Sequence, residues 1–369
     1  MKQVSAFIRR EPTFCAALAA AIISCFFTPP DAAYLGYIDF RTLALLYCLM
    51  VVVAGLRRAG IFALMADALC RRARSERQIA LMLVLLCFFS AMLVTNDVAL
   101  LTFVPFSVVV LGMAHLEKEL IWVVVMQTVA ANLGSMLTPV GNPQNLYLYS
   151  YYGMSAADFF SATLPVWLLS LALVLILCLP VPRAKISVFL GERPRLDTRC
   201  LTVYALLFLL CLAVVFRLMS WPVLLGVIIA ALLIYERRRL LSADFVLLLT
   251  FVCFFVFSGN LARIPAVDRL LRSALNGREL LGGALVSQVI SNVPAALLLS
   301  GFTDGAKALL LGVDIGGLGT PVASLASLIS LKLYSHVENA SAGRFLLVFS
   351  AVNAALLAVL LIFAEFLCV

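Results

Sequence analysis

Two matching sets of polar residues interrupt apolar segments in the two halves of the chain. In the first half, the pair Thr95-Asn96 lies inside one apolar run, and the pattern Gly-x-x-x-Thr-Pro-Val lies inside the next, at residues 134–140. In the second half, the pair Ser291-Asn292 and the same pattern at residues 316–322 repeat this order. Because Gly and Pro interrupt apolar segments at corresponding places in two halves, the sequence predicts a transport site built from broken helices.

The breaks would expose backbone groups that attract ions. An unpaired N–H or C=O at membrane depth costs several kcal/mol, so a break persists where something polar occupies it. Thr is a good N-cap and Pro suits the first helical position, so Thr138-Pro139 and Thr320-Pro321 predict the starts of second half-helices. Thr95-Asn96 and Ser291-Asn292 are predicted to cap the returning arms of two hairpins. Four helix N-termini that meet at the membrane midplane would favour an anion.

The same segments supply oxygen ligands of the kind that sodium accepts. Amide, hydroxyl and freed carbonyl oxygens are hard-cation ligands. Asp97 and Asp314 are the carboxylates near the breaks, and a carboxylate inside a membrane is a candidate cation ligand or proton carrier. Sodium is therefore the expected coupling ion, a proton is the alternative, and no other cofactor is expected. The predicted sodium ligands are Asn96, Thr138, Gly141, Asn292, Asp314 and Ser324, with carbonyls near Gly134, Gly316 and Gly319.

Each of these features also has a purely structural explanation. One Gly-Pro break in an apolar helix is more often a kink than a binding site. Ser, Thr or Asn in a membrane helix often bonds only a neighbouring helix, and Asp97 could simply favour a helix N-terminus. The duplication of the same polar residues at the same kind of break favours a transport site.

The composition indicates an all-α, polytopic membrane protein. The chain has 369 residues, is 64% hydrophobic and 12% charged, and has a mean hydropathy of +1.10, so it cannot cover a soluble fold with polar surface. Its ten cysteines lack Cys-x-x-Cys spacing and it has two histidines, which argues against a zinc site or a disulfide framework. The net charge of +8 comes from basic residues at span ends, so positive-inside topology explains it and no nucleic-acid partner is expected.

The distribution of charge predicts the order of the parts. Lys2, Arg9 and Arg10 precede the first apolar run and place the N-terminus in the cytoplasm, and residues 182–199 form the clearest cytoplasmic loop. Residues 1–39 are predicted to be a first transmembrane helix with an external loop, and 200–242 two linking transmembrane helices. The predicted repeats are 40–181, with a hairpin at 78–113 and a broken helix at 120–145, and 243–369, with a hairpin at 279–302 and a broken helix at 307–334.

The polar tips predict that both hairpins are re-entrant. For 78–113 we expect two half-length arms that enter and leave from one side, because two full crossings would bury Asp97 near a one-residue turn. Counting crossings, the first repeat starts outside and the second inside, so the repeats are inverted. The basic residues Arg263, Arg269, Arg272 and Arg278 are then external, against the charge rule.

These motifs resemble those of the ion transporter superfamily, which includes arsenite permeases, bacterial sodium/proton antiporters, and citrate and divalent-anion sodium symporters. The resemblance extends over 40–367 and rests on Thr95-Asn96-Asp97, the segment 141–145, Ser291-Asn292-Val293-Pro294 and Thr320-Pro321. It implies elevator movement of a hairpin-bearing domain, often in a homodimer.

The resemblance also implies which residues contact the substrate. In the similar divalent-anion symporters a Ser-Asn-Thr signature at each hairpin tip contacts substrate carboxylates. The third position here is Asp97 in one half and Val293 in the other, so the first tip is closer to the arsenite-permease and antiporter branch. The substrate-binding residues expected on this basis are Thr95, Asn96, Asp97, Asn142, Ser291, Asn292, Thr320 and Pro321.

The expected function is secondary active transport of an anionic or oxyanion-like substrate, a carboxylate or inorganic anion, coupled to sodium or protons. Sodium/proton antiport, arsenite-type efflux and an uncoupled channel or facilitator are the alternatives. An enzyme is not expected, because the sequence has no paired acid and base, nucleophile elbow, metal cluster or phosphate loop. The expected partners are a small anion and membrane lipid, with a homodimer as a further expectation, and the expected location is the inner or plasma membrane.

Overall fold

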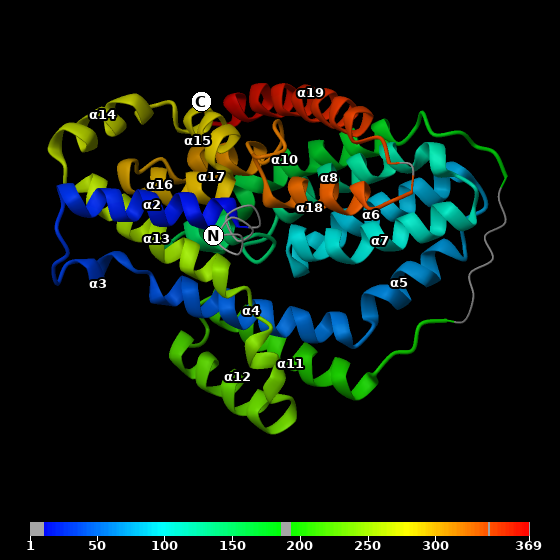
Figure 1. Cartoon of the computed structure of the whole chain (residues 1–369), viewed down its shortest axis with the longest axis horizontal. Helices are drawn as coiled ribbons and strands as arrows, with labels where there is room; N and C mark the ends of the chain where they lie inside the picture. Colours follow the sequence, from blue (N-terminus) through cyan, green and yellow to red (C-terminus); the bar gives the residue numbers. More distant parts are fainter. Residues whose placement is uncertain (1–10, 186–192, 339, 369) are drawn as a thin grey trace, which may run out of the picture.

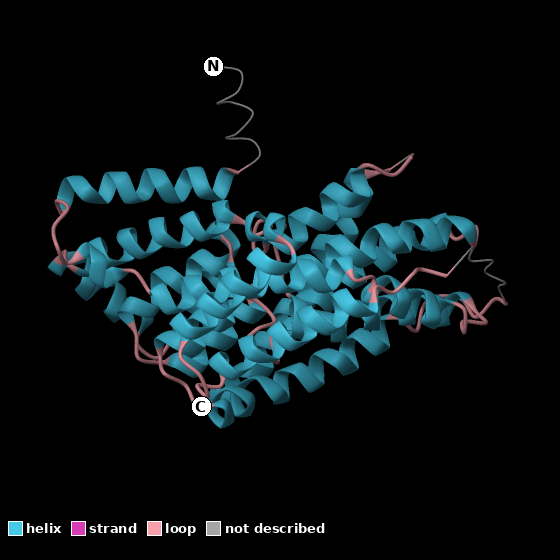
Figure 2. Ribbon diagram, turned by 90° about the horizontal axis from the view of Figure 1, so that it is seen from below, coloured by secondary structure: helices cyan, strands magenta, loops and turns pink. Residues whose placement is uncertain are grey.

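A computed structural model describes residues 11–185, 193–338 and 340–368. Within these residues every regular element is a helix, apart from one isolated antiparallel bridge between Ser75 and Lys185 (Figures 1 and 2). Lys2, Arg9 and Arg10, on which the cytoplasmic N-terminus was predicted, lie outside the described residues, as does the 186–192 part of the predicted cytoplasmic loop.

Seven helices in the described part of the chain are long and apolar enough to cross a membrane. At 1.5 Å per residue, a crossing needs about 20 helical residues. This confirms the prediction of an all-α, polytopic membrane protein. The seven are α4 (Phe40–Arg58), α6 (Glu76–Val94), α7 (Asn96–Met113), α10 (Ala156–Leu177), α11 (Thr198–Val215), α13 (Phe245–Ala262) and α19 (Ala342–Cys368).

One side of the molecule is built on α4. This helix packs against α11 and α12 (Trp221–Tyr235), which lie together at the bottom of Figure 1. Gly55 of α4 makes the close approach to α11 possible, because a Cβ at this position would lie 2.2 Å from the Tyr204 ring. The helix α2 (Pro12–Phe27) packs against α13. Along the chain, α3 (Tyr34–Tyr37) connects α2 to α4, and η2 (Arg237–Leu241) connects α12 to α13. The helix α5 (Ile61–Cys70) leads from α4 to α6 on the other side.

One of the basic residues that were predicted to lie on the external side of the membrane, Arg263, has an acidic partner. The guanidinium of Arg263, just after α13, lies 2.8 Å from the Asp31 carboxylate. It also donates to the Tyr37 hydroxyl at 3.1 Å. The hydrogen bond from Arg263 lowers the pKa of the Asp31 carboxyl, because it stabilises the charged form. The pair links the loop after α2 to the end of α13, and Arg272 is paired with Asp268 in α14 (Pro265–Leu275).

Two helical hairpins form the other side. The first hairpin is α6 and α7, joined by Thr95 alone; the second is α15 (Glu279–Ile290) and α16 (Asn292–Leu299), joined by Ser291 alone and followed by η3 (Ser300–Phe302). The arms of the first hairpin have 19 and 18 residues, so the expected half-length arms are wrong for it, whereas those of the second have 12 and 8. That both hairpins enter and leave from one side of the membrane stays a prediction.

Two helices are interrupted after the hairpins. The first break, residues 136–142, separates α8 (Leu120–Ser135, preceded by η1, Glu117–Glu119) from α9 (Pro143–Tyr151). The second break, residues 316–324, separates α17 (Ala306–Ile315) from α18 (Leu325–Ser335). The helix after each break packs against the other half of the chain. The helix α9 packs against α16 and α17, and α18 packs against α7 and α8. The hairpins and breaks therefore meet in the centre of the molecule (Figure 1).

Candidate substrate and cation site

Both hairpin tips have the same unusual backbone conformation. Thr95 has φ 72° and ψ 149°, and Ser291 has φ 76° and ψ 155°. Such angles are rare outside glycine and cost of order 1–3 kcal/mol per residue, so the surroundings must hold them. The next residue supplies a contact in each half. The N–H of Asn96 donates to the Gly141 carbonyl at 3.2 Å, and the N–H of Asn292 donates to the Ala323 carbonyl at 2.9 Å.

A second pair of hydrogen bonds also occurs in both halves. The Thr138 hydroxyl donates to the carbonyl of Met92, three residues before the first tip. The Thr320 hydroxyl donates to the carbonyl of Gln288, three residues before the second tip, at 3.0 Å. Each break is therefore bonded to the hairpin that precedes it, and the duplicated sequence pattern corresponds to a duplicated set of contacts.

The glycines that open the Gly-x-x-x-Thr-Pro-Val patterns allow the hairpins to approach. A Cβ on Gly134 would lie 2.0 Å from the carbonyl oxygen of Phe88 in the first hairpin. A Cβ on Gly316 would lie 2.8 Å from the Cα of Ala284 in the second. Phe88 and Ala284 both precede their tips by seven residues. The pattern thus encodes two equivalent backbone crossings.

The predicted starts of the second half-helices are wrong by about one turn. The helices begin at Pro143 and Leu325, after Asn142 and Ser324, and not at Thr138-Pro139 and Thr320-Pro321. The side chain of Asn142 accepts from the Asn145 N–H at 3.0 Å and caps α9. The threonine hydroxyls are not available as caps, because they donate to hairpin carbonyls. At the tips, the N-cap positions are Thr95 and Ser291 as predicted, but neither side chain makes a capping bond.

Reciprocal hydrogen bonds join the two halves. Asn132 and Asp314 stand two residues before Gly134 and Gly316, and are equivalent in the two patterns. The Ser324 hydroxyl donates to Oδ1 of Asn132 at 3.0 Å, and Nδ2 of Asn142 donates to Oδ1 of Asp314 at 3.4 Å. Each half-helix start is therefore bonded to the helix that precedes the break of the other half.

Asn132 and Asp314 each receive one further amide hydrogen bond. Asn96 at the first tip donates to Asn132 Oδ1 at 3.0 Å. Gln144 donates to Asp314 Oδ1 at 3.1 Å, while Asp314 Oδ2 has no hydrogen-bond partner among the described residues. Asp314 is 2% exposed and forms no ion pair within the part of the chain that the structure describes.

The carbonyls at the breaks, which were predicted as sodium ligands, accept hydrogen bonds from side chains. In the first half, Nδ2 of Asn145 donates to the carbonyls of Met136 and Thr138, and the indole of Trp167 donates to that of Gly134 at 3.2 Å. Sequence reasoning had assigned Asn145 and Trp167 no role.

In the second half a single side chain, Gln288 of α15, closes the break. Its Nε2 donates to the carbonyls of Gly316 at 2.8 Å and Leu318 at 3.0 Å. Its Oε1 accepts from the Thr320 N–H at 2.8 Å. Gly319, with φ 98°, leaves room for this amide, because a Cβ there would lie 2.2 Å from Gln288 Oε1.

Gln288→Ala is expected to destabilise the protein by about 1–2 kcal/mol, because the carbonyls and the N–H at the second break lose their partner. Thermal unfolding in detergent measures the change. Gln78→Ala is the matched control, since the exposed Gln78 side chain accepts a single bond within the described part of the chain, from the Arg74 N–H. Equal melting temperatures for the two variants would show that Gln288 does not close the break.

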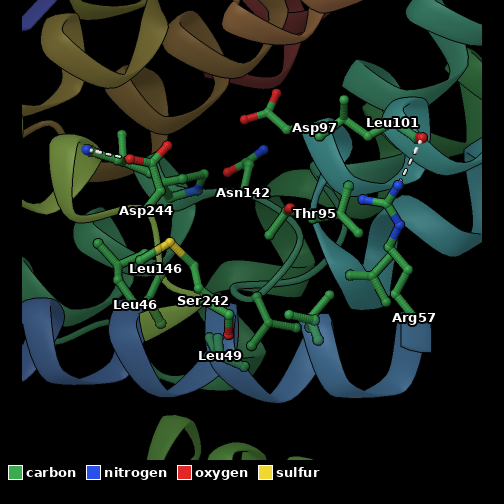
Figure 3. Close-up of a pocket in the computed structure, with 18 of the residues that line it drawn as sticks. Leu46, Leu49, Arg57, Thr95, Asp97, Leu101, Asn142, Leu146, Ser242 and Asp244 are labelled. Carbon is green, nitrogen blue, oxygen red and sulfur yellow. Dashed lines mark hydrogen bonds between the residues drawn. The ribbon is translucent and has the colours of Figure 1, made fainter. Parts of the chain in front are cut away.

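A cavity of about 640 Å³ lies beside the first tip, between that tip, α4, the start of α9 and the start of α13 (Figure 3). Its size is in the range of small-molecule binding sites. Thr95, Asp97 and Asn142 contribute polar groups, and Asp244, which caps α13, faces them. Apolar residues of α4 form the wall opposite the tip. Three arginines, Arg57, Arg58 and Arg239, also line it. Arg58 and Arg239 both pair with Glu236.

A second, much smaller chamber lies between the two tips. It has a volume of about 10 Å³. Its polar lining comes from both halves, and Asp97 lines both this chamber and the large cavity. The polar lining residues are Asn96, Asp97, Gln144, Asn292 and Ser324.

The structure thus divides the predicted site residues. Of the predicted substrate-binding residues, Thr95, Asp97 and Asn142 line the large cavity, while Asn96, Asp97 and Asn292 line the chamber. Ser291 and Thr320 bond within the second half, and Pro321 lies in the second break, where it lines neither space. Of the predicted sodium ligands, Asn96, Asn292 and Ser324 line the chamber. Asp314 does not line it but accepts a hydrogen bond from Gln144, which does. Thr138 and Gly141 form hydrogen bonds with the first hairpin.

Known proteins are similar to this chain over most of its length. The family model described as Citrate transporter (CitMHS) matches residues 4–310. An uncharacterized transporter of Methanocaldococcus jannaschii is 31% identical over 330 residues, which cover 89% of this chain and 90% of the relative. Inner membrane protein YbiR of Escherichia coli is 31% identical over 318 residues, which cover 84% of each chain. The chain therefore belongs to the citrate transporter family and is a membrane transporter, not an enzyme.

Proposed function

We propose that the protein is a secondary active transporter that moves a small anion, a carboxylate or inorganic anion, across the cell membrane in exchange for or together with sodium or protons. The family match, with its citrate transporter description, supports the anion class. The two halves would act as inverted repeats, and the hairpins with the broken helices would move as one body against α4, α11, α12 and α13, alone or in a homodimer.

The observation that carries the proposal is that helix N-termini face the large cavity. The first residues of α7 and α9, marked by Thr95 and Asn142, line it. The positive end of the helix dipole favours an anion at such a place. Arg58 and Arg239 share one carboxylate, that of Glu236, so with Arg57 this end of the cavity keeps a net positive charge, which attracts an anion from solution. By the positive-inside rule the end of the cavity lined by Arg57, Arg58 and Arg239 faces the cytoplasm.

A binding screen tests this proposal without requiring transport. Purified protein is heated with citrate, succinate, sulfate, phosphate or arsenite, and the melting temperature is recorded. A ligand that binds only the folded state raises this temperature. We expect at least one anion to do so in the wild type, and the shift to be lost in Asn142→Ala, which removes a polar group from the cavity wall. No shift with any member of the panel would contradict the anion proposal.

A second candidate, sodium/proton antiport, is favoured by the two carboxylates of the cavity, Asp97 and Asp244, which lie on facing walls (Figure 3). Carboxylates at membrane depth are the groups that carry cations and protons in transporters. Sodium-driven proton movement in vesicles that contain no anion of the panel would support this candidate over anion transport.

A further inference from the structure

Of the three arginines that line the large cavity, Arg57 alone has no acidic partner in the part of the chain that the structure describes. Arg58 and Arg239 share the carboxylate of Glu236. Arg57 forms no ion pair there, neither with that carboxylate nor with the two carboxylates of the cavity lining. Because a guanidinium stays charged in proteins, Arg57 brings a positive charge that no described side chain neutralises.

The guanidinium of Arg57 donates instead to a backbone carbonyl of the first hairpin. Its Nη2 lies 3.3 Å from the carbonyl oxygen of Leu101 in α7, a bond that Figure 3 shows. Within a helix this carbonyl would accept from the N–H four residues later, but that residue is Pro105, which has no N–H. Arg57 therefore supplies the donor that the helix lacks.

This bond leaves most of the guanidinium unused, since the Arg57 side chain makes no other hydrogen bond to a described residue. A guanidinium has five N–H groups and can bind two oxygens of a carboxylate or phosphate at once. A carbonyl oxygen carries only a partial charge, whereas an anion brings a full charge and more than one oxygen. An anion that reaches Arg57 is therefore a stronger partner than the Leu101 carbonyl.

The same bond joins the two parts that are proposed to move against each other. Arg57 belongs to α4, and Leu101 belongs to α7, the second arm of the first hairpin. Both residues line the large cavity, so the bond runs from one wall of the cavity to another (Figure 3). Breaking it releases α7 from Arg57 at that end of the cavity.

We propose that Arg57 binds the transported anion, and that its guanidinium leaves the Leu101 carbonyl to pair with that anion. The inference rests on the proposed anion transport and adds a link between substrate binding and movement. An anion that binds the state in which the Arg57–Leu101 bond is broken shifts the protein toward that state. Occupancy of the cavity thus releases the first hairpin from α4 at this contact.

Pro105→Ala tests the exchange of partners. The alanine supplies the N–H that the Leu101 carbonyl lacks, and because Pro105 is exposed the change opens no cavity. Arg57 is then held less firmly by α7, so an anion that stabilises the wild type should reach its half-maximal effect at a lower concentration. This gain should vanish when Arg57→Gln is added. Unchanged or weaker anion binding in Pro105→Ala would overturn the proposed exchange.

Charge variants test the binding role of Arg57. Purified protein is melted at fixed pH and ionic strength in rising citrate, succinate, sulfate or phosphate. For each anion that stabilises the wild type, Arg57→Gln should raise the half-maximal concentration about tenfold or more, as expected when a charged hydrogen-bond partner is lost. Arg57→Lys should lie between Arg57→Gln and the wild type, because lysine keeps the charge but not the planar fork of donors.

Arg58→Gln is the matched control, because Arg58 lines the same cavity and carries the same charge but is paired with Glu236. It should change the half-maximal concentration much less than Arg57→Gln does. Equal losses in the two variants would show that only the net charge of the cavity matters, and would overturn the proposal. An anion that stabilises the wild type and Arg57→Gln equally would also overturn it and leave the proposed function standing, whereas no effect of any anion on the wild type would refute that function itself.

Discussion

Replacing Asn96 or Asn292 by alanine is expected to reduce anion uptake by about 100-fold, because each change removes a polar group from the wall between the tips, which shares Asp97 with the cavity proposed for the anion. Both side chains line the chamber between the tips. The folded structure should persist, since the N–H groups that bond Gly141 and Ala323 belong to the backbone and remain in both variants.

The control for these two variants is Asn353→Ala. Asn353 is also buried, but it lies in α19, and among the described residues its side chain bonds only the Phe349 carbonyl of its own helix. Uptake into proteoliposomes, normalised to folded protein, should fall in both tip variants and stay near the wild-type rate in the control. An uptake rate equal to that of the wild type in either tip variant would show that this tip side chain is not needed for transport.

Gly134→Ala is expected to prevent correct packing of the first hairpin. The new Cβ would lie 2.0 Å from the Phe88 carbonyl oxygen, and this atom belongs to the backbone, so no side-chain rotation relieves the clash. Overpacking of this kind costs about 1–3 kcal/mol, and more where the neighbour is rigid. Because α6 carries the tip, the variant should lose both stability and uptake.

A second glycine gives the matching control. A Cβ on Gly112 of α7 would have no atom of another segment within 4 Å, so Gly112→Ala meets open space. In the last turn of α7 this change should stabilise by up to about 0.5–1 kcal/mol, because Ala has the higher helix propensity. Melting temperatures and yields of the two variants should move in opposite directions. If both variants melt together with the wild type, the hairpin does not lie against α8 as described.

Duplicated local patterns predicted the parts of the site that each half builds for itself. The polar pairs at 95–96 and 291–292 indicated the positions of the hairpin tips, and the two Thr-Pro patterns indicated the positions of the breaks. Such patterns are readable because a polar or glycine residue inside an apolar segment has few explanations other than a turn, a break or a close approach.

Contacts between distant segments could not be predicted in this way. Thr138 has the residue type of an N-cap, but its hydroxyl meets the Met92 carbonyl in the folded chain, and Asn142 becomes the cap. Gln288 occupies the second break from another helix, and Asp244 reaches the cavity from the end of a linking segment. Nothing local in the sequence distinguishes Gln288 or Asp244 from ordinary polar residues.

The most direct test of coupled anion transport is accumulation of citrate by proteoliposomes with a sodium gradient and a proton gradient imposed separately. We predict that one of the two gradients drives citrate, or another anion that binds in the stability screen, above its equilibrium concentration, and that Asn292→Ala abolishes this accumulation. Equilibration of the anion without accumulation under either gradient would contradict coupled transport and indicate a passive pathway.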